Sequence, residues 1–464
     1  MSSTTEAGPS VAPAARELRA QLGPDRVLVS GALYDKARKI WNGAVDREPA
    51  LIVCAETAAE VQAAVLTARD DRLPLSVRGG GHDWAGRALR PGGLVIDLTG
   101  MRQVVVDTHA RTAIVGGGAT AREVIAAAAP HGLVAATGTC GSVGMTGLTL
   151  VGGYGPLNGR FGLALDNLLA AEVVLADGRM VTADAAHEPE LFWAVRGGGG
   201  NFGVVTSIRV RLHPAPRLLA GFIEFAWEQA AGVWDGLRAV LADAPDELTV
   251  QSGILPGLHG APRMFLFPVW SGEAAPGERA IDELARLGTS AVSQVGPMTY
   301  PALLGLFDPS IVDGRHYAIR TRSVADFTPS VISALADAGP AVTSLLSIVS
   351  IHHFHGAAER VPLDATAFGN RRKHFTFEIV AAWEPDDAKG ARHRSWADSF
   401  SAALAPHALP GGYPGLLGPD AHDQIAAAYG QNATRLRAAK ARFDPDGVFC
   451  ATALPPGTAV SRPS

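Results

Sequence analysis

The sequence has few cysteines, no block of basic residues and no long apolar run. Its three cysteines, Cys54, Cys140 and Cys450, are too sparse and odd a set to build a disulfide scaffold. Acidic residues number 45 and basic residues 40, for a formal net charge of -5, which argues against a nucleic-acid partner. No apolar segment is long enough to cross a bilayer, and the N-terminus lacks the pattern of a secretory signal. We therefore expect a cytoplasmic protein that binds neither nucleic acid nor membrane.

The sequence is rich in apolar residues and in glycine. Hydrophobic residues make up 47% and charged residues 18%, which is typical of a folded chain of two or three domains. Glycine, at 53 residues, clusters between Gly79 and Gly203, and this favours backbone contact with a ligand. Cys54 and Cys450 follow apolar residues and are expected to be buried. Cys140 differs, because its neighbours are glycine, threonine and serine.

Two glycine-rich segments each place one nucleophilic side chain beside residues with little or no side chain. The first is Arg78-Gly79-Gly80-Gly81-His82-Asp83, and the second runs from Cys140-Gly141-Ser142-Val143-Gly144 through Gly147 to Gly152-Gly153-Tyr154-Gly155. Small residues let the backbone approach a ligand closely, and successive N–H groups can cradle its oxygens. A ligand open to attack by both an imidazole and a thiol points to a covalently held flavin.

Two other glycine clusters resemble nucleotide-binding loops without completing them. Gly116-Gly117-Gly118 lies between a strand pattern and a helix pattern, as in a dinucleotide fingerprint. The next strand pattern, residues 133–136, does not end in the acidic residue that would hold a ribose. The run from Gly197 to Gly203 lacks the Lys-Ser/Thr ending of a Walker loop. Nicotinamide and nucleotide triphosphate binding are therefore not favoured.

Periodicity predicts an α+β fold. Before residue 216, short strands are expected at 50–54, 75–77, 94–98, 102–107, 112–115, 171–175 and 204–212, with helices at 57–70 and 119–129. After it, longer strands are expected at 219–227, 248–255, 264–270, 345–354 and 375–383, with helices at 227–242 and 329–338. The second part fits an antiparallel sheet with helices covering one face, whose other face could roof a ligand site.

Further motifs occur in one order along the chain. They are Arg78 to His82, Val95 to Leu98, Cys140-x-x-Val143-Gly144-x-x-Gly147, Gly152 to Gly155, Arg160 to Leu168, Leu191 to Thr206, Tyr429-Gly430-x-Asn432 and Phe443-Asp444-Pro445. Together they resemble the berberine-bridge-enzyme-like FAD-linked oxidases of the vanillyl-alcohol-oxidase superfamily, in their bacterial secondary-metabolite branch. The motifs are dense in the first half and sparse between residues 220 and 340.

The resemblance implies a PCMH-type FAD-binding domain of two subdomains and a substrate domain. We expect a flexible tail at 1–30, the FAD-binding domain at 31–215, the substrate domain at 216–410 and a C-terminal segment at 411–464 that returns to the FAD domain. The resemblance also implies one FAD held by two covalent bonds. His82 would be bonded to the 8α-methyl carbon and Cys140 to ring carbon 6. The other cofactor-binding residues that it implies are Arg78, Gly79, Gly80, Gly81, Asp83, Val143, Gly144, Gly147, Gly153, Tyr154, Val205 and Gly415.

Catalysis needs a group that takes the hydroxyl proton when hydride leaves carbon. Tyr413 stands where the family has a tyrosine, as base or substrate-orienting phenol, and Gly415 replaces the usual asparagine. Strand alternation puts Ile351, His353 and His355 on one face, and we expect His353 and His355 to face the flavin. No third ligand accompanies these histidines, so no metal site is expected.

Glu378 and Trp383, on the next strand, are weaker candidates. We expect an oxidase that removes hydride from a hydroxyl-bearing carbon of a bulky secondary metabolite or glycoside and passes electrons to dioxygen, giving hydrogen peroxide. A flavin-dependent oxygenase or oxidative cyclase, and a resistance flavoprotein that sequesters a drug, stay open as alternatives. The partners are a small-molecule substrate and O2, and the protein is expected to be a monomer or a homodimer.

Overall fold

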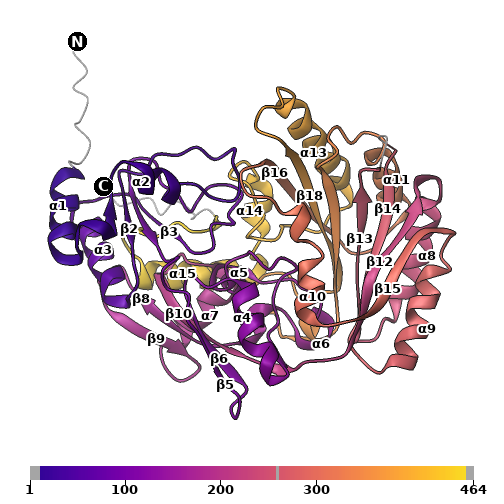
Figure 1. The fold of residues 1–464 in the computed structure, drawn as a ribbon, viewed down its shortest axis with the longest axis horizontal. Coiled ribbons are helices and arrows are strands. Elements are labelled where there is room, and N and C mark those ends of the chain that lie inside the picture. The colour runs from indigo at the N-terminus through magenta and orange to yellow at the C-terminus, as the bar shows by residue number, and fades with distance from the viewer. Residues whose placement is uncertain (1–10, 258–260, 456–464) are drawn as a thin grey trace.

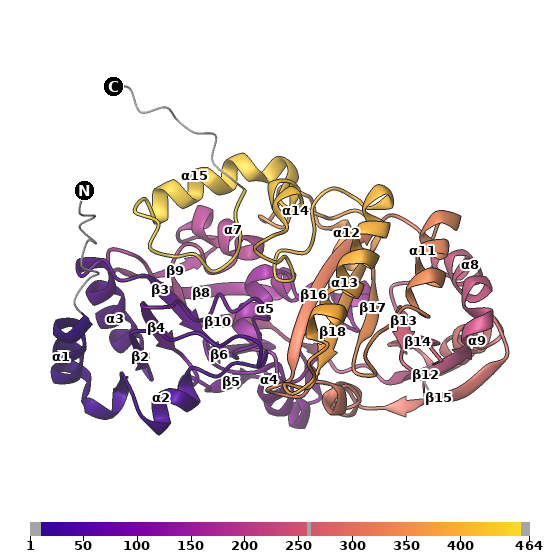
Figure 2. The ribbon, with the colours of Figure 1, turned by 90° about the horizontal axis from the view of Figure 1, so that it is seen from above.

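The computed structural model describes residues 11–257 and 261–455. Within them, two smaller sheets lie side by side at one end of the molecule, and a seven-stranded sheet lies at the other (Figure 1). Figure 2 shows the chain crossing from the first end to the second and coming back: the C-terminal helices lie over the N-terminal half. This is the α+β architecture that the sequence predicts.

The N-terminal half builds one partly parallel and one antiparallel sheet. The first has the order β1 (Val27–Leu28), β2 (Leu51–Cys54), β4 (Leu94–Asp97), β3 (Leu75–Arg78), and β4 is parallel to both β2 and β3. The second has the order β5 (Val104–Asp107), β6 (Thr112–Gly116), β10 (Val204–Arg211), β8 (Leu168–Val174), β9 (Met180–Asp184). A short pair, β7 (Leu133–Val134) and β11 (His213–Pro214), lies beside them.

The seven-stranded sheet is antiparallel throughout. Its order is β15 (Ser290–Met298), β12 (Leu218–Ala226), β14 (Arg263–Trp270), β13 (Leu248–Leu255), β17 (Ile348–Phe354), β18 (His374–Trp383), β16 (His316–Val324). Apolar side chains on one face, among them Val349, Ile351 and Phe377, form a core with the helices that cover it. The opposite face looks toward the glycine-rich loops of the N-terminal half.

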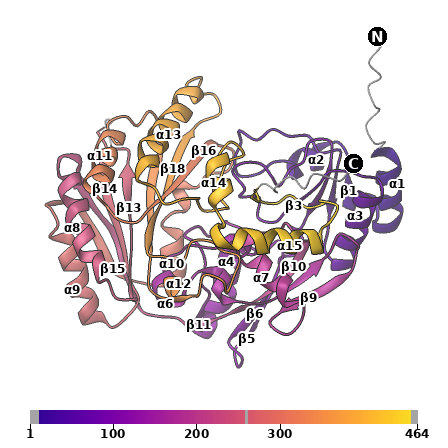
Figure 3. The same cartoon turned by 180° about the vertical axis from the view of Figure 1, so that it is seen from behind.

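Helices cover the outer face of this sheet and flank the two smaller ones (Figures 1 and 3). Those on the seven-stranded sheet are α8 (Ala230–Ala242), α9 (Ala274–Ala285), α11 (Pro329–Ala338) and α13 (Gly390–Leu404). The others are α1 (Val11–Leu22), α2 (Ala32–Ala37), α3 (Ala58–Asp70), α4 (Ala121–Ala128), α5 (Met145–Val151), α6 (Asn158–Phe161), α7 (Pro189–Gly198), α10 (Tyr300–Gly305), α12 (Ala357–Arg360), α14 (His422–Ala427) and α15 (Ala433–Phe443). Within the described residues, no helix is long and apolar enough to span a membrane.

Residues of the Gly116–Gly118 cluster serve the packing of the chain itself. A Cβ atom on Gly118 would overlap the carbonyl oxygen of Leu98, and one on Gly117 would lie 2.7 Å from the carbonyl oxygen of Val205. The helix that follows begins with a capping box, in which Thr120 and Glu123 satisfy each other's backbone N–H groups. The cluster therefore allows a close turn between β6 and α4.

Two sequence predictions are wrong at this level. Residues 11–22 form helix α1 rather than part of a loose tail, because Ala14 and Leu18 are fully buried against the sheet of β2 and β4. Cys450 is exposed rather than buried, because the chain turns outward after Phe449, which takes the buried place instead. Cys54 is half-buried, and desolvation raises the pKa of its thiol to about 11.

Replacing Leu18 by alanine should lower the free energy of unfolding by about 2–4 kcal/mol, since it removes a fully buried side chain from a packed core. Urea denaturation followed by far-UV circular dichroism measures the change. Arg16→Ala, at an exposed position of the same helix, serves as the control and should change the free energy by less than about 0.5 kcal/mol. Equal, small effects in both variants would show that α1 does not pack.

Candidate active site

The two glycine-rich loops meet backbone to backbone. A Cβ atom on Gly80 would overlap the backbone nitrogen of Gly144, and one on Gly144 would lie 2.6 Å from the backbone nitrogen of Gly80. Because glycine has no Cβ, it alone allows this approach. The contact brings the segment of His82 to that of Cys140: Nε2 of His82 lies 2.9 Å from Oγ of Ser142, two residues beyond the cysteine.

His82 lies at the end of a stack of three aromatic rings. Its imidazole is 4.7 Å from the Trp41 ring, centroid to centroid, and Trp41 is 3.8 Å from the Tyr317 ring, both nearly parallel. Desolvation lowers the pKa of His82 to about 4, a shift that the negative charge of Glu378 opposes. The imidazole is therefore neutral at pH 7 and keeps a lone pair for nucleophilic attack.

Cys140 is the less reactive of the two nucleophiles. Desolvation raises the pKa of its thiol to about 12, and the negative charge of Glu378 adds to the shift. The thiol is consequently protonated at neutral pH, whereas the thiolate is the form that attacks carbon. Any bond from Cys140 should form slowly and be favoured by alkaline pH.

Tyr413 lies directly over the Gly152–Gly153 turn. The backbone N–H of Gly153 donates to Oη of Tyr413 at 2.8 Å, and a Cβ on Gly152 would lie 2.5 Å from the phenol ring. Burial raises the pKa of the Tyr413 phenol well above its usual value. The phenol is therefore protonated at neutral pH, so the geometry favours an orienting role over that of a base.

Tyr154 ties the same turn to the seven-stranded sheet. Nδ1 of His374 lies 2.7 Å from the carbonyl oxygen of Arg372, which only accepts, so Nδ1 carries the imidazole proton. Nε2 of His374 then accepts from the phenol of Tyr154 at 2.8 Å. This hydrogen bond directs the Tyr154 hydroxyl into the sheet.

Two residues expected to bind the cofactor, Arg78 and Asp83, make side-chain contacts with the chain itself. Nη1 of Arg78 donates to Oδ2 of Asp97 at 3.0 Å. Asp83 accepts from Nε and Nη2 of Arg87, and Arg87 donates in turn to the carbonyl oxygen of Gly415 at 3.2 Å. These side chains fix the loops, and the backbone of the loops is left to meet a ligand.

The remaining expected residues lie on the same loops or beside them. Gly147 is exposed with open space around it, the carbonyl of Val143 accepts from the amide of Ala121, and Gly81 has a φ of +70°. Gly79 lies against the carbonyl oxygen of Gly117. Gly117 in turn lies against the carbonyl oxygen of Val205.

The structure turns the ring of His353 away from the loops, whereas His355 packs against Gly159 of α6 and places its Nε2 3.4 Å from Oγ1 of Thr249. His353 stacks on Phe375 and on His355, with centroids 5.2 and 3.9 Å apart, and both of its ring nitrogens are buried without a hydrogen-bond partner among the described residues. Phe375 and Ile351 belong to the core beneath the helices. Strand alternation therefore holds: the ring of His353 packs among core side chains and that of His352 points toward the loops, although both residues line one small cavity.

His352 and Glu378 form the polar pair on the face toward the loops. Nε2 of His352 lies 3.2 Å from Oε2 of Glu378 and 3.2 Å from Oγ of Ser350, and Nε2 of Gln251 donates to Oγ of Ser350 at 2.5 Å. The charge of Glu378 acts on His82, Cys140 and Tyr413, three residues from three different segments. This carboxylate therefore lies close to the place where these segments meet.

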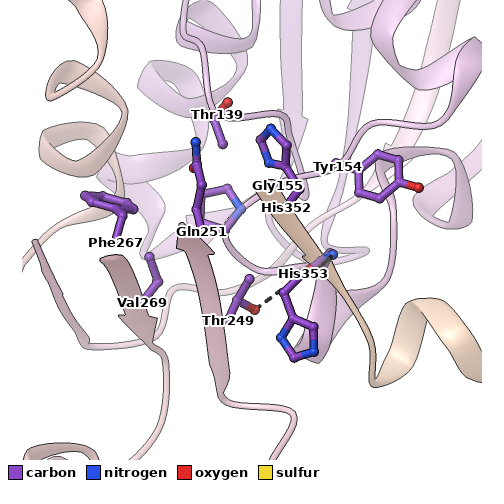
Figure 4. Close-up of a pocket in the computed structure, with 11 residues that line it drawn as sticks. Thr139, Tyr154, Gly155, Thr249, Gln251, Phe267, Val269, His352 and His353 are labelled. Carbon is purple, nitrogen blue, oxygen red and sulfur yellow. Dashed lines mark hydrogen bonds between the residues drawn. The ribbon is translucent and has the colours of Figure 1, made fainter. Parts of the chain in front are cut away.

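A small cavity of about 10 Å³ lies between this face and the second loop (Figure 4). Figure 4 shows the rings of His352 and His353 on opposite sides of their strand, with His352 on the side of Thr139 and Gln251. The lining residues are Thr139, Tyr154, Gly155, Pro156, Asn158, Thr249, Gln251, Phe267, Val269, His352 and His353. Thr139 precedes Cys140, so the cavity adjoins the second nucleophile.

The residues present fit an FAD group. The second loop offers backbone with open space around it at Gly147, and the hydroxyl of Thr146 is buried without a partner among the described residues. A neutral imidazole and a thiol lie on adjoining loops. Within the described part of the chain, no cluster of three histidine, cysteine, aspartate or glutamate side chains could hold a metal ion.

Fold and site together define an FAD-linked oxidoreductase. Residues 49–184 match the FAD binding domain family, and residues 417–453 match the berberine and berberine-like family. The chain is 32% identical over 434 residues to (R)-6-hydroxynicotine oxidase of Paenarthrobacter nicotinovorans, covering 90% of this chain and 93% of that protein. It is 32% identical over 429 residues to an FAD-linked oxidoreductase of Gibberella zeae, covering 90% and 82%.

Solved structures agree with these relatives. The crystal structure of 6-hydroxy-D-nicotine oxidase from Arthrobacter nicotinovorans superimposes with a TM-score of 0.85 at 30% identity, covering 92% of this chain and 96% of that one. A xylooligosaccharide oxidase from Myceliophthora thermophila has the same fold, with a TM-score of 0.84 at 24% identity over 96% of this chain and 99% of that one. The chain belongs to the berberine-bridge-enzyme-like family of FAD-linked oxidoreductases.

Sequence reasoning missed His352, Trp41 and Tyr317. The strand pattern could have indicated His352. It shares a strand face with the polar Ser350, whereas His353 shares one with the apolar Val349 and Ile351. Trp41 and Tyr317 lie in loop and strand patterns with no motif around them, and their stacking comes from tertiary structure alone.

Replacing Gly80 by alanine should separate the two loops, because the new Cβ meets backbone that cannot move aside. We expect the purified protein to lose most of its flavin per polypeptide and about 1–3 kcal/mol of unfolding free energy. Flavin absorbance against protein, and urea denaturation, measure these changes. Gly232→Ala, in open space on α8, is the control and should leave both values unchanged or slightly raise stability.

Proposed function

We propose that this protein is an FAD-dependent oxidase that removes hydride from a hydroxyl-bearing carbon of a bulky secondary metabolite or glycoside. Dioxygen then takes the electrons and becomes hydrogen peroxide. The observation that carries the proposal is the His352–Glu378 pair on the sheet face that looks toward the loops of His82 and Cys140. It supplies a proton acceptor opposite the two residues that would hold the cofactor.

FAD, when bound, would supply the hydride acceptor. His82 and Cys140 would hold it by two covalent bonds. Nε2 of His82 makes a hydrogen bond with Oγ of Ser142 at 2.9 Å, which leaves Nδ1 to form the covalent bond to the flavin. The resulting cofactor could not be lost, so the site could stay open to a bulky substrate.

The hydrogen bonds of His352 determine which of its ring nitrogens carries the proton. An ionised carboxylate only accepts, so the 3.2 Å contact with Glu378 requires a proton on Nε2 of His352. In the neutral imidazole, Nδ1 is then the nitrogen that can accept a hydrogen bond. A substrate hydroxyl can give its proton to this pair as hydride leaves, and Glu378 stabilises the imidazolium that forms.

Tyr413 would orient the substrate from the other side. Its phenol accepts the N–H of Gly153, which leaves the phenol proton available to a substrate oxygen. This assignment replaces that of Tyr413 as base. His353 and His355 are no longer proposed as catalytic residues.

Two relatives support oxidase chemistry on a small molecule, since their names are those of a 6-hydroxynicotine oxidase and a xylooligosaccharide oxidase. Measurement of peroxide against substrate consumed separates the alternatives. One peroxide per substrate supports the oxidase. Oxygen consumed without peroxide would favour an oxygenase, and tight binding without turnover would favour a drug-sequestering flavoprotein.

Replacing Glu378 by glutamine should lower the rate of flavin reduction by substrate about 10²- to 10⁴-fold, because the imidazolium of His352 loses its counter-charge. Anaerobic stopped-flow absorbance measures this rate, and flavin content should not change.

Glu224→Gln is the matched control, since Glu224 lies on the same sheet and pairs with Arg263 at 2.7 Å; its reduction rate should be unchanged. A larger loss in a fully flavinylated His353→Leu variant than in Glu378→Gln would restore His353 as the base.

Acid precipitation tests the two bonds. Wild type, His82→Ala and Cys140→Ala should each retain flavin in the pellet, and the double variant should not. In His82→Ala the remaining bond needs the Cys140 thiolate, whose pKa is raised to about 12. Its formation should therefore accelerate about tenfold per pH unit between pH 7 and 9. A colourless wild-type pellet would exclude both bonds, and a pH-independent rate in His82→Ala would contradict the thiolate step.

A further inference from the structure

Trp41 joins the histidine loop, the glycine-rich segment that carries His82 and continues to Trp84, to the seven-stranded sheet. Its ring lies between those of His82 and Tyr317, at 4.7 and 3.8 Å, with interplanar angles of 16° and 17°. Its backbone N–H donates to the carbonyl of Gly81 at 3.0 Å, and its carbonyl accepts from the amide of Gly314 at 2.9 Å. The indole N–H is buried without a partner among the described residues, so stacking rather than a hydrogen bond orients the ring.

The next residue, Asn42, clamps this segment to β16. Its side chain is 2% exposed, and it both donates to the carbonyl of Tyr317 at 3.0 Å and accepts from the amide of Tyr317 at 2.9 Å. Nδ2 also donates to the carbonyl of Trp84 at 2.7 Å, on the histidine loop. Gly43 follows, and a Cβ there would overlap the carbonyl oxygen of Gly314. The segment 41–43 is therefore held from both sides.

Trp41 lies outside the residues that match the FAD binding domain family, which begin at residue 49. Neither Trp41 nor Tyr317 belongs to the glycine-rich motifs. The ring of Trp41, backed by that of Tyr317, nevertheless stacks on a face of the His82 ring, while Ser142 holds Nε2 at the ring edge. One contact fixes the plane of the imidazole, and the other fixes its rotation within that plane.

We propose that Trp41, supported by Tyr317, is a positioning residue that orients the His82 imidazole for covalent attachment of the flavin. The inference rests on the proposed histidyl bond. In that step, one C–H bond of the 8α-methyl group and the N–H bond of His82 break, and one C–N bond forms. The two electrons and two protons released pass to dioxygen, which becomes hydrogen peroxide.

The test follows the rate of attachment in two single-nucleophile backgrounds. Protein produced under riboflavin limitation is incubated with FAD, and covalent flavin is measured by fluorescence of the denatured polypeptide after electrophoresis. In the Cys140→Ala background, where His82 alone can bond, Trp41→Ala should slow attachment about tenfold or more, because a misaligned nucleophile loses its near-attack geometry. Trp41→Phe keeps a stacked ring and loses no hydrogen bond, so it should restore the rate to within about threefold.

The His82→Ala background is the matched control. There Cys140 alone can bond, and Trp41→Ala should leave its rate unchanged, whereas a general loss of structure would slow both backgrounds. Equal rates with and without the Trp41→Ala substitution in the Cys140→Ala background, or equal slowing in both backgrounds, would overturn the inference and leave the proposed bonds intact. Absence of covalent flavin in Cys140→Ala itself would overturn the histidyl bond, and the inference with it.

Discussion

The contact between Gly80 and Gly144 is the constraint on which the rest of the site depends. Two loops from distant parts of the sequence meet there with no side chain between them, because a Cβ on either residue would collide with backbone. This approach brings the groups of the site together. The imidazole of His82 reaches Ser142, and the charge of Glu378 acts on both Cys140 and Tyr413. The glycines are thus needed first for the chain to meet itself, and the surface open to a cofactor is a consequence.

Desolvation at this meeting point acts in opposite directions on the two nucleophiles. It disfavours the charged form of each group, and the charged form is the unreactive one for histidine but the reactive one for cysteine. The same environment therefore prepares His82 and suppresses Cys140. A bond from His82, formed first, would hold the ring against Cys140 and compensate for its scarce thiolate by proximity.

The sequence allowed much of the fold to be predicted, because local signals are strong where elements are regular. The helix expected at 329–338 begins and ends at those residues, since Thr328 caps it and Pro329 starts it. Strands β15 and β16 went unpredicted because they lie at the sheet edges, where alternation is weak. At the site, His82 and Cys140 follow from motifs. The motifs do not show which face of β17 looks toward the loops. Both faces carry histidine, and the choice depends on which face the helices cover. The Gly116–Gly118 cluster forms an ordinary strand-to-helix turn, which is the alternative to a dinucleotide loop and agrees with the missing acidic residue.

The site also needs the seven-stranded sheet to stay in register with the loops, and the structure holds it at two separate places. At one edge, Asn42 pairs with both backbone groups of Tyr317 on β16. Nearer the middle, Asn158 donates to the carbonyl of His353 at 2.9 Å and accepts from Thr249 at 3.4 Å, which fixes β17 and β13. Two side-chain amides, one from a loop and one from α6, therefore bind different strands of the sheet. The backbone carbonyl of His353 serves this purpose while its ring lies in the core, so the side chain of His352 is directed into the site by its neighbour's main chain.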